Sequence, residues 1–89
     1  MKEKQIIDHV KNDLRRVAKW AGEIDKPFPK EKIDIFLRHA MKDFRSLPPK
    51  NTKRLEGSFM EVIQQERVGQ DSLQRLRWAE KVLTLSCRL

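Results

Sequence analysis

The 89-residue sequence predicts an all-α protein, in its simplest form a small four-helix bundle with an antiparallel, up-down-up-down order of helices. Apolar residues recur at three- and four-residue steps in four segments, and breaker residues separate these segments. No segment shows the strict alternation that a half-buried strand requires. We expect helices over about 3–21, 30–46, 52–67 and 71–87 within a single domain spanning 1–89, because so short a chain rarely divides. Short connections favour antiparallel neighbours.

The first two expected helices each carry one apolar face. In the first, the face comprises Ile6, Ile7, Val10, Leu14, Val17, Ala18 and Ala21, and Gly22 follows it. In the second, it comprises Ile33, Phe36, Leu37, Ala40, Phe44 and Leu47, with Met41 at its edge. Pro29 suits the first turn of the second helix, and Pro48-Pro49 predicts its end.

The third expected helix has fewer apolar residues than the first two, and it begins at a pair of polar residues. Asn51 or Thr52 can cap it by accepting a bond from an unpaired amide. Its inward residues are Leu55, Phe59, Val62 and Ile63, and Gly69 follows its end. Asp71 then has the position of an N-terminal cap for the fourth helix.

The fourth helix has two apolar rows instead of one. Leu73, Leu76, Ala79, Leu83 and Cys87 form the row that we assign to the core, and Trp78, Val82, Leu85 and Leu89 form a second row displaced around the helix. One hypothesis is that the second row binds a protein partner or a second copy of the chain, with Arg75 and Lys81 at its rim. The alternative is a central helix with both rows covered by its neighbours. Ile35 and Met60 also fall outside the core faces of their helices, which adds slightly to the interaction hypothesis.

The composition favours a charged protein outside the membrane. Of the residues, 38% are hydrophobic and 37% are charged, and no run approaches the length of a membrane span. No secretory leader precedes the first helix, and Cys87 has no second cysteine to pair with, so we expect a cytoplasmic protein.

The formal net charge of +7 creates a field that attracts polyanions. Lys50, Lys53 and Arg54 lie at the start of the third helix, where backbone amides also favour phosphate. Together with Arg15 and Arg16 they are the residues of an alternative hypothesis, a basic regulatory protein that binds nucleic acid. The acidic residues interleaved along the chain leave open the simpler interpretation of a solvated charged surface.

A weak internal repeat suggests a metal site. His9 and Asp13 are spaced four residues apart, as are His39 and Asp43 thirty residues later. If the first two helices form a hairpin about Lys26, these four side chains converge, and two imidazoles with two carboxylates suit zinc or iron. The alternative is two separate surface pairs.

Catalytic signatures are missing from the sequence. Its serines lack a G-x-S-x-G elbow, and the glycines at 22, 57 and 69 do not make a phosphate loop. We therefore expect no enzyme activity, no cofactor and no small-molecule substrate. The leading hypothesis is a non-enzymatic interaction module that binds a protein partner or itself through its last helix.

Overall fold

The computed structural model describes residues 3–64 and 71–89, and for 49–52 it describes the backbone only. Four helices make up these residues: α1 (Glu3–Gly22), α2 (Lys30–Arg45), α3 (Pro49–Gln64) and α4 (Ser72–Arg88). No strand occurs within these two ranges. The prediction of an all-α protein is confirmed.

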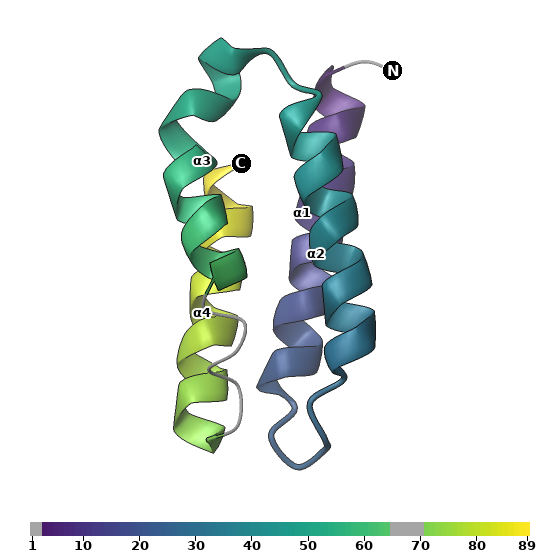
Figure 1. Cartoon of the computed structure of the whole chain (residues 1–89), viewed down its shortest axis with the longest axis vertical. Coiled ribbons are helices and arrows are strands. Elements are labelled where there is room, and N and C mark those ends of the chain that lie inside the picture. The colour runs from purple at the N-terminus through teal and green to yellow at the C-terminus, as the bar shows by residue number, and fades with distance from the viewer. Residues whose placement is uncertain (1–2, 65–70) are drawn as a thin grey trace.

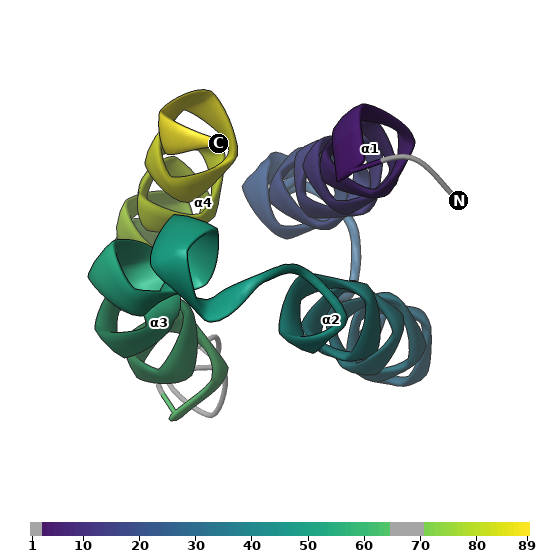
Figure 2. The same ribbon diagram turned by 90° about the horizontal axis from the view of Figure 1, so that it is seen from above.

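The helices contact one another in a closed cycle. α1 packs against α2 and α4, and α3 packs against the same two helices. Seen along the bundle, the four helices occupy the corners of a square, with α1 diagonal to α3 and α2 diagonal to α4 (Figure 2). The connection between α1 and α2 lies at one end of the long axis and that between α2 and α3 at the other (Figure 1). These contacts fit a compact bundle, which measures 38 × 21 × 18 Å.

The apolar faces predicted for the first three helices form most of the core. Their buried residues are Val10, Leu14, Val17, Ala18 and Ala21 from α1, Ile33, Leu37, Ala40, Met41 and Phe44 from α2, Leu55, Phe59 and Val62 from α3, and Leu47 between α2 and α3. Ile6, Ile7, Phe36 and Ile63 are partly buried against them. The rings of Phe44 and Phe59, with centroids 4.8 Å apart, join α2 to α3.

Two helix boundaries bear on the predictions. α3 begins at Pro49, and not at 52, because a proline is accommodated in a first turn, where its missing N–H has no helical partner. Asp71 does cap α4: its carboxylate accepts a hydrogen bond of 3.2 Å from the Leu73 amide. The predicted end of the third helix, 65–67, and Gly69 lie outside the described residues.

The predicted orientation of α4 is wrong. Trp78 and Leu85 are 2% exposed and Val82 is 0% exposed, so the proposed binding row forms part of the core. The row assigned to the core is largely on the surface, with Leu73 and Leu83 at 54% and 47% exposure.

Contacts with both neighbouring helices explain this orientation. The Trp78 indole N–H donates a 2.9 Å hydrogen bond to the Val62 carbonyl of α3, and the rings of Trp78 and Phe28 pack edge to face with their centroids 6.0 Å apart. On the other side, the Ala79 Cβ lies 3.9 Å from the position that a Cβ on Gly22 of α1 would take. A tryptophan therefore gains more than a leucine from facing the core at this place. Its large ring makes apolar contacts there, and its N–H, a donor that leucine lacks, has a hydrogen-bond partner.

None of the described helices is both long enough and apolar enough to cross a membrane.

Candidate interaction surfaces and polar sites

The exposed face of α4 carries an apolar row. Leu73, Leu76 and Leu83 are 54%, 39% and 47% exposed, and Cys87 is exposed one turn further on. Their steps of three, seven and four residues keep them on one side of the helix, and Glu80 occupies the place between Leu76 and Leu83. We call Leu73, Leu76, Leu83 and Cys87 the outer row of α4. It lies away from the row that was predicted to bind, of which only Leu89 is partly exposed.

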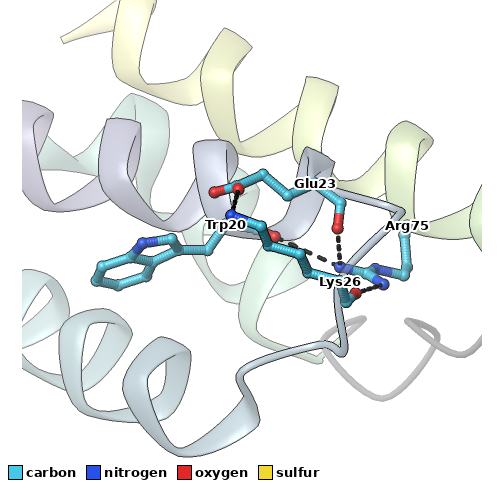
Figure 3. A network of polar contacts seen from close by, with 4 residues as sticks. All are labelled: Trp20, Glu23, Lys26 and Arg75. Atoms are coloured by element: carbon cyan, nitrogen blue, oxygen red, sulfur yellow. Dashed lines mark hydrogen bonds and ion pairs between the residues drawn. The ribbon is translucent and has the colours of Figure 1, made fainter.

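Arg75 was predicted at the rim of an interface, but it is buried and bonds to the end of α1. Its Nε donates to the Ala21 carbonyl at 3.2 Å, and its Nη1 donates to the Lys26 carbonyl at 2.8 Å. Its Nη2 is shared between the carbonyls of Trp20, at 3.4 Å, and Glu23, at 3.1 Å. Figure 3 shows the guanidinium beside the carbonyls of Trp20, Glu23 and Lys26, next to the ion pair of Lys26 with Glu23, which measures 3.0 Å.

Arg75 supplies hydrogen-bond donors to carbonyl groups at and just after the end of α1. The last carbonyls of a helix have no amide within the helix to bond, and when they are buried they require another donor. Five N–H groups in a rigid plane make arginine suited to several carbonyls at once. The guanidinium also lies 5.3 Å from the centroid of Phe28.

The spacing of Arg75 in the sequence already indicates that it is buried. Arg75 continues the row of Trp78, Val82 and Leu85 at three- and four-residue steps, so it lies on the buried face.

Lys81, the other predicted rim residue, is exposed and lies on the side of α4 toward α3. Its Nζ is 3.8 Å from the Glu61 carboxylate. Lys81 therefore belongs to a surface ion pair between the two helices.

Three of the four predicted metal ligands come together. The Nδ1 of His39 lies 2.7 Å from the Asp13 carboxylate and 3.7 Å from the Asp43 carboxylate, so His39 connects α2 to α1. The ligand atoms of Asp13, His39 and Asp43 all lie within 4.8 Å of one another. His9 is exposed and is not one of this group.

The geometry of these three side chains is that of a hydrogen-bonded cluster. Two ligands of one tetrahedral zinc ion lie about 3.3 Å apart, given bonds of about 2.0 Å. The 2.7 Å separation of His39 Nδ1 and Asp13 Oδ2 is shorter and leaves the proton of a direct hydrogen bond between them. A metal ion would have to displace that proton. The metal site stays a prediction, which elemental analysis of protein purified without a chelator would test.

The hydrogen bond to Asp13 raises the pKa of His39 above its ordinary value of 6.5, and the negative charge of Asp43 acts in the same direction. The buried Oδ2 of Asp43 has no hydrogen-bond partner. Protonated His39 therefore brings a positive charge between two carboxylates.

The predicted nucleic-acid residues divide between diagonal helices. Lys53 and Arg54 are exposed on α3, and Arg15 and Arg16 are exposed on α1, which does not contact α3 in the described part of the chain. The Arg16 guanidinium lies 5.8 Å from the Phe36 ring centroid, toward α2. The side chain of Lys50 lies outside the described residues. The structure therefore does not join these groups into one continuous basic surface.

Comparisons of the chain with protein-family models, with curated proteins and with solved structures find no match.

Proposed function

We propose that the chain is a non-enzymatic interaction module that pairs with a second copy of itself through the outer row of α4. The observation that carries the proposal is the large exposure of three leucines in one row on a helix whose other apolar row is already buried. Complete burial of a fully exposed leucine side chain contributes roughly 1.5–3 kcal/mol, and each of these half-exposed leucines would contribute about half of that. The proposal assumes the up-down-up-down order of helices and the cytoplasmic location expected from the sequence.

The row is suited to an antiparallel, two-fold contact. With the axis near Glu80, Leu76 of one copy lies level with Leu83 of the other, and Leu73 lies level with Cys87. The same axis places Glu80 level with Glu80 of the second copy, so the two carboxylates repel each other at the centre, and Arg77 of each copy lies about one turn away. A self-complementary patch of this kind is what a two-fold dimer requires.

Net charge opposes the pairing of two copies, and this gives the proposal a distinctive dependence on salt. Each copy carries +7, and salt screens the repulsion between them. An apolar dimer of like-charged copies should therefore strengthen as the salt concentration rises.

The test is the molar mass in solution, measured by light scattering at low and high salt. We expect the dimer fraction to rise with salt and to disappear in a variant with Leu76→Glu and Leu83→Glu. Ile35→Glu is the matched control, because Ile35 is 63% exposed on α2, away from α4. A monomer at both salt concentrations, or equal loss of the dimer in the control, would contradict the proposal.

The same samples test the alternative function. A protein that binds nucleic acid would co-purify with material absorbing at 260 nm, and its affinity would fall linearly with salt on logarithmic axes. Binding of this kind, without a dimer, would support the alternative function instead.

A further inference from the structure

A groove of about 550 Å³ lies between α2 and α3, away from the outer row of α4. Four apolar residues line it: Met60 and Ile63 of α3, which are partly exposed, and Leu37 and Met41 of α2, which are core residues with only 2% and 9% exposure. The remaining lining residues are Asp34, Arg38, Lys42 and Arg45 of α2. Met60, which fell outside the core face in the sequence pattern, is thus part of a concave surface.

The shape of the groove suits the apolar side of another helix. From Asp34 to Arg45 it follows eleven residue steps of α2, about 16 Å or three helical turns. Two of its four apolar residues are methionines, whose unbranched, polarisable side chains adapt to the side chains that they meet. An amphipathic helix that lays its apolar face into such a groove is a recurring form of protein recognition.

Charge determines which kind of helix fits. Arg38, Lys42 and Arg45 lie at steps of four and three residues, so they form one exposed basic row along the groove, and Asp34 is the one carboxylate among the described residues that line it. Carboxylates on a docked helix would meet this row, and lysines would be repelled.

We propose that this groove binds an amphipathic helix of an acidic protein partner, with its apolar residues between α2 and α3 and its carboxylates against Arg38, Lys42 and Arg45. A second copy of the chain fits less well, since it carries +7. Nucleic acid fits less well too, because the described residues that line the groove include no aromatic side chain to stack on a base. The site goes beyond the proposed self-association and uses different helices.

The experiment measures the fluorescence anisotropy of a labelled helical peptide of about 14 residues, with leucines along one face and glutamates beside them. A second peptide with lysine in place of each glutamate is the charge control. We expect the acidic peptide to bind and the basic peptide to bind at least about tenfold more weakly.

Two pairs of substitutions locate the binding site. Arg38→Glu with Lys42→Glu reverses the charge at two of the three basic positions along the groove. This variant should bind the acidic peptide about tenfold more weakly, or weaker still. Arg15→Glu with Lys19→Glu changes the net charge equally, at the same four-residue spacing on α1, and should change binding by less than about threefold. Met60→Ala should weaken binding through lost apolar contact while the charge stays constant, and circular dichroism verifies that each variant is folded.

Three results would overturn the proposal. One is no binding of the acidic peptide to the unaltered chain at about 1 mM, a concentration at which even weak complexes form. Another is equal binding of the acidic and basic peptides. The third is equal loss of affinity in the two charge-reversed variants, which would mean that net charge alone attracts the peptide.

Discussion

Arg75 shows how one polar residue on a buried face determines the way two helices meet. Its guanidinium joins α4 to the end of α1 and to the turn that follows, through four backbone carbonyls that belong to 20–26. Without these donors the buried Ala21 carbonyl would have no partner, which costs about 1–3 kcal/mol, whereas the carbonyls of Trp20 and Glu23 would keep the backbone amides that they also accept. We interpret Arg75 as a structural residue that fixes the packing of α4 on α1.

Replacing Arg75 should therefore destabilise the fold. Arg75→Met keeps much of the side-chain length but removes every donor, and we expect a loss of about 3 kcal/mol in the free energy of unfolding, measured with urea. Arg75→Lys should restore little, because an ammonium group does not reach several carbonyls in one plane. Arg77→Met, at an exposed position of the same helix, is the control and should cost less than about 0.5 kcal/mol. Equal losses at 75 and 77 would contradict the structural role.

His39 should make stability depend on pH. Because the pKa of His39 in the folded state is raised above 6.5, the folded state binds the imidazole proton more tightly than the unfolded state does. The stabilisation is complete below pH 6.5, the ordinary value, and is lost as the pH rises through the folded pKa.

The effect is small, since the His39 side chain is 58% exposed and water screens its ion pairs. We expect the urea midpoint to fall as the pH rises above 6.5, and His39→Gln to remove this part of the fall. His9→Gln, at an exposed position outside the cluster, is the control. A pH profile unchanged by His39→Gln would show that the Asp13–His39–Asp43 cluster contributes nothing measurable.

At the scale of the helix, α4 shows where sequence periodicity stops being informative. One apolar face per helix was enough to identify the buried sides of α1, α2 and α3, and the expected hairpin of the first two helices correctly placed Asp13 beside His39. On α4 two apolar rows satisfy the same spacing, so the spacing cannot choose between them. The choice depends on tertiary contacts: the Trp78 indole reaches a carbonyl of α3, and Arg75 reaches the carbonyls at the end of α1.

The outer row of α4 also predicts a specific cross-link. In an antiparallel dimer with its axis near Glu80, Cys87 of one copy lies level with position 73 of the other. Leu73→Cys should therefore give disulfide-linked dimers under mild oxidation, much faster than the unaltered chain, in which Cys87 is the single cysteine. Ile35→Cys is the matched control, a second exposed thiol on α2. Equally fast cross-linking in the control would contradict the contact, and fast cross-linking through Cys87 alone would indicate parallel helices.

At the scale of the whole molecule, the two proposed surfaces use different parts of the square of helices seen in Figure 2. The groove belongs to α2 and α3, and the outer row belongs to α4 alone. The positive charge of the chain favours binding of an acidic helix and opposes pairing of two copies. Because salt screens both effects, it should weaken helix binding and strengthen pairing. Peptide binding and dimer formation should therefore occur together without competition.

Both the fold and the proposed self-association depend on which side of α4 faces the core. The most direct measurement compares the urea unfolding of Trp78→Ala and Leu83→Ala at a concentration where the chain is monomeric. We predict that Trp78→Ala costs about 3–5 kcal/mol or unfolds the chain, and that Leu83→Ala costs less than about 1 kcal/mol. If Leu83→Ala proves as costly as Trp78→Ala, the leucine row is part of the core and the account of α4 is contradicted.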